Sequence, residues 1–185
     1  MRAVELVFAV GWAAFWIYWI IAAFSTKSAK RGRISWAREL RVRAVIFVLT
    51  LVLIRLGAFR DHGLGTDPWR AGAGLVLFAA GLAFSIWARI NIGHNWGGPM
   101  SQKNDAELVT SGPYRLVRHP IYSGILVGLI GTALAMDWSW LIVVALAGVY
   151  FIYSAVAEER NLTKQFPDTY PAYKRSTKML LPFIF

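Results

Sequence analysis

The chain has 185 residues, of which 57% are hydrophobic and 16% are charged, and it contains no cysteine. This balance lies outside the range of soluble globular domains and indicates an integral membrane protein. Disulfides and thiolate zinc sites are excluded, and with only His62, His94 and His119 as soft ligands we expect no metal enzyme. The net charge of +10 fits cytoplasmic loops and anionic lipid, so nucleic acid is not expected as a partner.

Five segments are apolar enough to be predicted as membrane spans. A transmembrane helix needs about 20 mainly apolar residues, so the chain has room for four or five spans and short loops. The predicted fold class is therefore all-α, with a single membrane domain over residues 1–185. The expected spans lie at Val4–Phe24, Ala44–Phe59, Ala71–Ala88, Ile121–Met136 and Trp138–Ala157.

Three of these spans carry features that bear on packing. Arg55 lies near the distal end of the second span, where its side chain can reach the interface. Gly72, Gly74 and Gly81 in the third span are expected to allow close approach of neighbouring backbones. Only Asp137 separates the last two spans, which predicts a tight antiparallel hairpin.

Basic residues predict the orientation in the membrane, because cytoplasmic loops are enriched in Lys and Arg. The segment 27–43 holds seven such residues, the loop 89–118 four, and the tail after residue 158 five. The opposite side has only Arg2, Arg60 and Arg70. We therefore expect an inner or plasma membrane protein with its N-terminus outside. The loop 91–120 and a helical tail, 158–185, then face the cytoplasm together.

The third loop leads into the fourth span at a possible anion site. Pro120 suits the first turn of a helix, so His119 is expected near its cap. The unpaired N–H groups of such a helix start, with Arg118 and His119 beside them, can bind a carboxylate or phosphate. Equally, Arg118 and His119 can simply anchor the helix among lipid headgroups, and both readings stay open.

Two adjacent carboxylates, Glu158 and Glu159, stand at the far end of the fifth span. Placed at a membrane boundary, they repel each other and require a positive partner. One reading is a structural network in which Arg118, Arg160 or Lys164 is that partner. The other is a pocket with an anion site on one wall and carboxylates on the other.

Such a pocket suits a zwitterionic cofactor. S-adenosylmethionine carries a carboxylate, an ammonium and a sulfonium, and the two cations are stabilised by carboxylates and aromatic faces. Competing cofactor motifs are weak, because Gly72-Ala73-Gly74 follows no strand and lies within a span.

Motifs over more than half of the chain support this interpretation. They comprise Trp87-Ala88-Arg89 with Gly93 and Trp96, residues Leu108–Tyr114, residues Arg118–Gly124, and Glu158-Glu159 with Leu162, Phe166, Tyr170, Tyr173 and Pro182. Together they resemble the isoprenylcysteine carboxyl methyltransferase family, which extends to phospholipid methyltransferases and related small-molecule methyltransferases of bacterial membranes.

The resemblance implies an all-helical membrane enzyme that uses S-adenosylmethionine. The acceptor would be lipid-like or a small hydrophobic molecule that enters from the bilayer. The family's cofactor contacts would fall on Gln102, Glu107, Leu108, Val109, Tyr114, His119, Pro120, Ile121 and Tyr122. Glu158 would be a substrate-site or catalytic residue, and either Glu158 or Glu159 could take a proton from an amine or thiol acceptor. The sequence sets no oligomeric state.

Two positions depart from the family pattern. The prenylcysteine enzymes keep an arginine one helical turn before the first glutamate, where this chain has Ser154. Serine lacks the charged fork that holds a carboxylate, which argues against a prenylcysteine carboxylate as acceptor. A common Phe-Gly step becomes Phe166-Pro167, which is expected to end the helix abruptly.

Two other functions compete with methyl transfer. A sterol-type reductase that uses NADPH shares, by resemblance, the helical hairpin and the Arg-His-Pro-x-Tyr motif. A non-enzymatic transporter or accessory subunit would show an ionisable residue in mid-span, and only Arg55 comes near that position.

Overall fold

The computed structural model describes residues 2–23, 29–30, 67–96, 102–103 and 107–182, and the expected second span, Ala44–Phe59, lies outside them. The described helices are α1 (Arg2–Ala23), α3 (Pro68–Ile92), α4 (Pro120–Ala135), α5 (Trp140–Gln165) and α6 (Tyr170–Ser176), with 3-10 turns η2 (Gly93–Asn95) and η3 (Gly112–Arg115). Two short strands, β1 (Ala29–Lys30) and β2 (Gln102–Lys103), pair antiparallel. Apart from this strand pair, the expected all-α class is confirmed.

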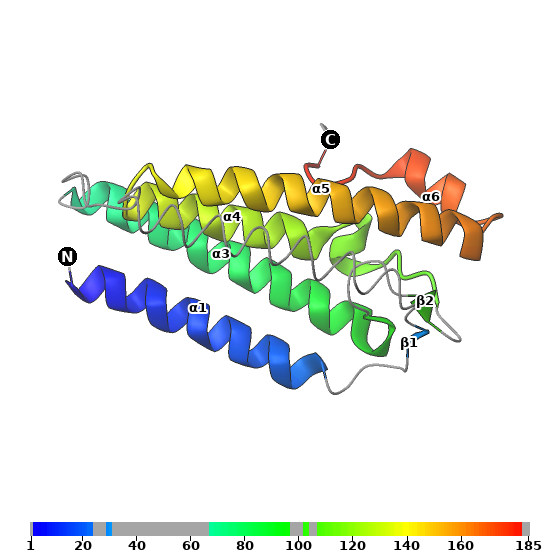
Figure 1. Cartoon of the computed structure of the whole chain (residues 1–185), viewed down its shortest axis with the longest axis horizontal. Helices are drawn as coiled ribbons and strands as arrows, with labels where there is room; N and C mark the ends of the chain where they lie inside the picture. The colour runs from blue at the N-terminus through cyan, green and yellow to red at the C-terminus, as the bar shows by residue number, and fades with distance from the viewer. Residues whose placement is uncertain (1, 24–28, 31–66, 97–101, 104–106, 183–185) are drawn as a thin grey trace.

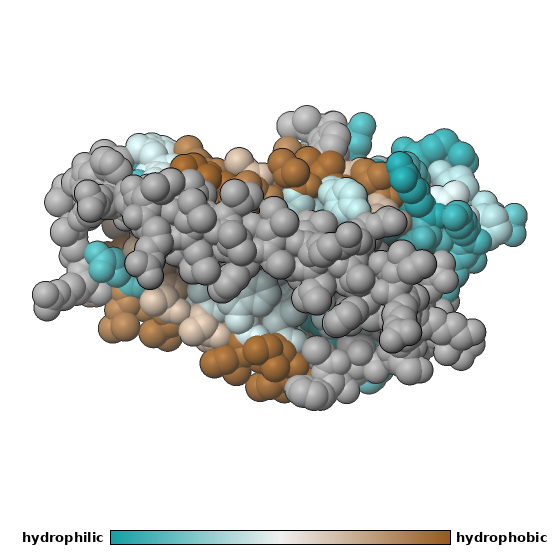
Figure 2. All heavy atoms as spheres, in the orientation of Figure 1, coloured by the Kyte–Doolittle hydropathy of each residue, from teal (hydrophilic) through white to brown (hydrophobic). Residues whose placement is uncertain are grey.

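Helices α1, α3 and α5 are long and apolar enough to cross a membrane, whereas α4 is a shorter apolar helix. Apolar side chains such as Ile21 (64%) and Val149 (70%) are exposed on α1 and α5. Figure 2 shows these hydrophobic surfaces along the sides of the bundle and hydrophilic residues gathered at the end that carries α6. Such surfaces are stable in lipid and unfavourable in water, so the protein is an integral membrane protein.

The ends of α3 are marked by local capping. The Asp67 side chain accepts a hydrogen bond from the Trp69 N–H at 3.0 Å, and Pro68 occupies the first turn. At the other end Gly93 has a φ of 51°, the left-handed region that favours glycine. The helix extends beyond the expected span, 71–88, at both ends because these caps, not hydropathy, determine where it stops.

Small residues bring α3 and α4 into backbone contact. A methyl group on Gly81 would lie 2.5 Å from the Gly124 carbonyl oxygen, and one on Gly74 would lie 2.6 Å from the Gly131 carbonyl oxygen. The expected close approach at Gly74 and Gly81 is therefore confirmed. At Gly72 no such approach is seen in the described part of the chain, where nothing lies within 4 Å of a methyl group at this position. The contact fixes α4 firmly against α3.

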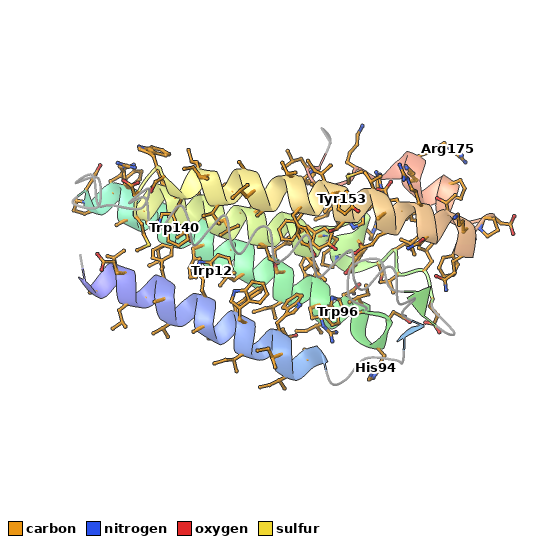
Figure 3. The ribbon with its side chains drawn as sticks, viewed as in Figure 1. Trp12, His94, Trp96, Trp140, Tyr153 and Arg175 are labelled. Carbon is orange, nitrogen blue, oxygen red and sulfur yellow. The ribbon has the colours of Figure 1, made fainter. Side chains whose placement is uncertain are left out.

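Helix α1 packs on α3 through aromatic rings. Phe8 and Phe15 are buried, and the Phe8 and Phe78 ring centroids lie 4.6 Å apart. Trp12 points from α1 toward α3 and α4, where its Nε1–H donates to Thr132 Oγ1 at 3.2 Å (Figure 3). These contacts join α1 to the bundle core.

Short connections precede and follow α5. Residues 136–139 join it to α4, and there the buried Asp137 carboxylate accepts a hydrogen bond from the Ser139 N–H at 2.8 Å. Helix α5 continues past Ala157 to Gln165, with Phe166 as its C-cap. Its end immediately before Pro167 matches the sequence prediction. Residues 166–169 then lead into α6, which lies beside the far end of α5 (Figure 1).

Candidate active site

The candidate site lies at the end of the bundle where η3, the start of α4, the end of α5 and α6 come together (Figure 1). Backbone pairing joins the third loop to the tail. Val117 forms a parallel bridge with Lys178, and the N–H of Arg118 donates to the Lys178 carbonyl at 2.8 Å. The N–H of His119 donates to the Met179 carbonyl at 3.1 Å. The expected meeting of these two segments is therefore observed.

His119 caps α4, directly before Pro120, as the sequence predicts. Its imidazole is buried between two carboxylates, with Nδ1 3.3 Å from Glu158 Oε2 and Nε2 3.5 Å from Glu159 Oε1. Burial alone lowers the pKa of His119, but the hydrogen bonds and charges of both glutamates outweigh it and raise the pKa above its usual value. The site therefore favours a protonated His119.

Glu158 is held from two sides and is still partly open. The Tyr122 hydroxyl donates to Glu158 Oε1 at 2.6 Å, while His119 faces the other oxygen. The Tyr122 ring stacks between the rings of His119, at a centroid distance of 5.5 Å, and Phe151, at 4.5 Å. A quarter (25%) of the Glu158 side chain is exposed. Its carboxylate is thus oriented and accessible at once.

Glu159 is in a different environment, because it is buried (3% exposed) and paired on both oxygens. Arg118 Nε lies 2.7 Å from Oε1, and Lys174 Nζ lies 2.6 Å from Oε2. Arg118 Nη1 also donates to the carbonyls of Lys174, at 3.2 Å, and Thr177. This confirms the expectation that Arg118 is a positive partner of the adjacent carboxylates. Because protein acceptors already use Nε and Nη1 of Arg118, these two nitrogens are not available to an anion, and an anion-binding role for Arg118 stays a prediction.

The other expected partners of the glutamates do not join this network. Arg160 and Lys164 are exposed, and the second cation is Lys174 on α6, which sequence reasoning missed. The only signal in the sequence was the need of adjacent carboxylates for positive charge. That signal does not say which of several basic residues the fold brings into contact.

Tyrosines of the tail and of η3 complete the interior of the site. The Tyr173 hydroxyl donates to the Tyr114 carbonyl at 2.7 Å, and burial raises the pKa of Tyr173 to about 12. Burial also raises the pKa of Tyr114 and Tyr170 well above the usual value, so all three stay neutral. The buried Tyr170 hydroxyl and Ser154 Oγ have no hydrogen-bond partner in the described part of the chain.

The remaining predicted cofactor residues are more dispersed. Pro120 and Ile121 are buried in the first turn of α4. The N–H of Glu107 donates to Asn95 Oδ1 at 3.4 Å, beside η2. Leu108 and Val109 are partly buried, and Val109 packs against the hydrophobic core. Gln102 lies on β2, and its side chain is outside the described structure.

Comparison with known proteins identifies the family. Residues 69–169, which include α3 from its second residue, α4 and both glutamates, match the phospholipid methyltransferase family. Because this match covers more than half of the chain, the protein belongs to that family, and the resemblance expected from the sequence is confirmed.

Individual relatives carry several different names. The chain is 29% identical over 141 residues to the nickel-cobalt-cadmium resistance protein NccN of Alcaligenes xylosoxydans xylosoxydans, covering 73% of this chain and 61% of NccN. It is 37% identical over 70 residues to methanethiol S-methyltransferase 1 of Bradyrhizobium diazoefficiens, covering 38% and 24% of the two chains. It is 30% identical over 130 residues to steroid 5-alpha-reductase DET2 of Solanum lycopersicum, covering 64% and 45%. The chain thus spans about three fifths of NccN and less of the others.

Proposed function

We propose that this protein transfers a methyl group from S-adenosylmethionine to a lipophilic or small hydrophobic acceptor. One observation carries the proposal. In a chain of the phospholipid methyltransferase family, Glu158 is partly exposed and oriented by Tyr122 and His119 at the point where loop and tail meet. These are residues on which the family's cofactor and substrate contacts are expected.

The donor set fits this cofactor. The carboxylate of Glu158 suits an ammonium or sulfonium, and the positive end of the helix dipole at the start of α4 suits a carboxylate. The buried hydroxyls of Ser154 and Tyr170 leave unused hydrogen-bonding capacity next to this cluster on α5 and α6. Residues that would hold the cofactor are Tyr114, His119, Pro120, Ile121 and Tyr122, together with Gln102, Glu107, Leu108 and Val109. When bound, S-adenosylmethionine supplies an activated methyl group.

The residues of the chain would orient the reactants and accept the proton that the reaction releases. Methylation of a thiol or amine releases one proton, and Glu158 is the accessible carboxylate that can take it. Tyr122 and His119 hold the two oxygens of Glu158 in place, so the carboxylate does not have to reorient during the reaction. Because the surrounding side chains are buried, most of the acceleration is expected from holding the reactants in contact.

Ser154 supports an acceptor other than a carboxylate. It is completely buried (0% exposed) on α5, one helical turn before Glu158. A carboxylate acceptor held there would need a cation, and a serine hydroxyl provides none. The match to a protein named as a methanethiol S-methyltransferase agrees with this. We therefore propose a thiol, amine or neutral acceptor.

The membrane arrangement proposed with this function has five spans, the last two forming a hairpin. The N-terminus lies outside, and the site faces the cytoplasm in an inner or plasma membrane. The uneven distribution of Lys and Arg supports this orientation.

A second candidate is a reductase of the steroid 5-alpha-reductase type, which the match to DET2 favours. The residues Arg118-His119-Pro120 and Tyr122 are common to both interpretations. The two differ in cofactor, so ligand binding separates them directly.

Binding and turnover by the purified protein in detergent test the proposal. Calorimetry should show binding of S-adenosylmethionine and none of NADPH. Tyr122→Phe should weaken binding about fivefold or more, because it removes one hydrogen bond to a charged group. Tyr153→Phe is the matched control, since Tyr153 is on the exposed side of α5 (Figure 3). Binding of NADPH alone would establish the reductase reading, and equal affinities of both variants would place the site elsewhere.

The acceptor is tested with methyl-labelled cofactor. Methyl transfer to a small hydrophobic thiol, an aminophospholipid and N-acetyl-farnesylcysteine should favour the thiol or amine. Ser154→Arg should increase transfer to the farnesylcysteine carboxylate. A clear preference of the parent for that carboxylate, with no gain from Ser154→Arg, would show that another cation already holds it.

A further inference from the structure

We propose that the two adjacent glutamates have separate tasks. Glu158 faces the reacting groups, whereas Glu159 is a positioning residue that fastens α6 and the segment 177–180 onto the start of α4. The inference rests on the proposed function, because it divides the roles within the same site. The sequence left both glutamates as candidates for the catalytic carboxylate, and the proposal assigns that role to Glu158.

The direction of each side chain separates the two residues. Neighbouring residues on a helix are about 100° apart, so Glu158 and Glu159 both reach His119 but otherwise face different partners. Glu158 points to Tyr122 on α4 and is 25% exposed. Glu159 points to Arg118 and Lys174 and is 3% exposed, with one cation on each oxygen. An ion-paired, buried carboxylate is poorly placed to take a proton from a reactant.

Helix α6 depends on such contacts. It has only seven residues, Tyr170–Ser176, and a helix of this length is not stable alone in water. Its position is set by the pair between Lys174 and Glu159, by Arg118 donating to the Lys174 carbonyl, and by Tyr173 donating to the Tyr114 carbonyl. Glu159 itself forms the pair with Lys174. It also pairs with Arg118 and so holds the arginine that donates to the Lys174 carbonyl.

The position of α6 is passed on to His119 through the next few residues. Arg118 also donates to the Thr177 carbonyl, and the Ser123 hydroxyl donates to the Leu180 carbonyl at 2.6 Å. Between these two points, the His119 N–H donates to the Met179 carbonyl. Loss of the Glu159 pairs therefore loosens a segment that holds the backbone of His119, and His119 in turn orients Glu158.

The test compares four variants with the parent: Glu159→Gln, Lys174→Met, the double variant that carries both of these changes, and Glu158→Gln. Lys164→Met is the matched control because Lys164 is an exposed lysine of α5. Glu159→Gln and Lys174→Met should each raise KM for S-adenosylmethionine about tenfold while kcat stays within about threefold. Both should also accelerate hydrogen exchange of residues 170–180. Glu158→Gln should lower kcat and leave that exchange at the rate of the parent, and Lys164→Met should change neither quantity.

The double variant tests whether the two residues act through one contact. If they do, its effect on KM and exchange is smaller than the product of the two single effects. Lys174 is half exposed (49%), so Lys174→Met keeps the test open if Glu159→Gln does not fold. Parent-like exchange in Glu159→Gln, or a loss of kcat equal to that of Glu158→Gln, would overturn the positioning role. A parent without turnover of S-adenosylmethionine would refute the proposed function, while exchange and the double variant would still decide the role of Glu159.

Discussion

The contact between α3 and α4 makes Gly81→Ala the most demanding test of the fold. A methyl group at this position would lie 2.5 Å from both the Gly124 carbonyl oxygen and the Gly128 nitrogen, and 3.0 Å from Gly128 Cα. All three atoms belong to the α4 backbone, so no side chain can rotate away. Ordinary contact begins at 3.4 Å, which means that the two helices must separate by roughly 1 Å.

Such overpacking costs about 1–3 kcal/mol, and the rigid backbone on the opposite side places Gly81→Ala near the upper limit. Alanine regains about 0.5–1 kcal/mol relative to glycine within a helix. The expected net loss is therefore about 2 kcal/mol, or a melting temperature lower by about 4–8 °C.

Thermal unfolding in detergent, followed by circular dichroism, measures this difference. Gly72→Ala is the matched control on the same helix, because a methyl group there meets no described residue within 4 Å. It should melt at or slightly above the temperature of the parent. If Gly81→Ala and Gly72→Ala melt together, the two helices are not in backbone contact and the packing described above is wrong.

Two further predictions concern charge. His119 faces Glu158 and Glu159, which lie near the end of α5, and these contacts raise its pKa. The protonated side chain therefore stabilises the fold. This stabilisation is complete below the ordinary pKa of 6.5 and is lost as pH rises through the raised pKa. The parent should therefore lose more thermal stability between about pH 6 and about pH 9 than His119→Gln does, and equal pH slopes would contradict this. Because the chain has no cysteine, single cysteines at Ser28 and Ser176 can report topology, and both should resist a membrane-impermeant thiol reagent in intact cells. Labelling of either from outside would reverse the proposed orientation.

Helix type and several boundaries could be predicted from the sequence because local chemistry determines them. Pro120 begins α4 directly after His119, and Pro167 follows the end of α5. The length of α5 could not be predicted from hydropathy. After Ala157 its residues are polar except for Leu162, and a helix that leaves the bilayer continues in water without an apolar run.

Part of the site could also be predicted, because the charges of its residues can be read from the sequence. The juxtaposition of loop and tail followed from charge asymmetry, and the need of Glu159 for a cation followed from electrostatics. The identity of Lys174 did not follow, because it depends on how the chain turns between Gln165 and Tyr170 and on the contacts of a short helix. Likewise, Gly72 and Gly81 look alike in sequence, and only the rotation of α3 against α4 distinguishes them.

The hydrogen bonds from His119 and Ser123 to the carbonyls of Met179 and Leu180 have a consequence for biosynthesis. The partners are separated by 60 residues in the first pair and 57 in the second, and the later ones are translated only after α4 and α5. Chains emerge from the ribosome at roughly 5–20 residues per second, so α4 exists for several seconds without the segment that binds its start. During that interval the membrane helices can pack while the site is still incomplete. Ligand binding by nascent chains should therefore begin only once residue 180 has cleared the ribosomal tunnel.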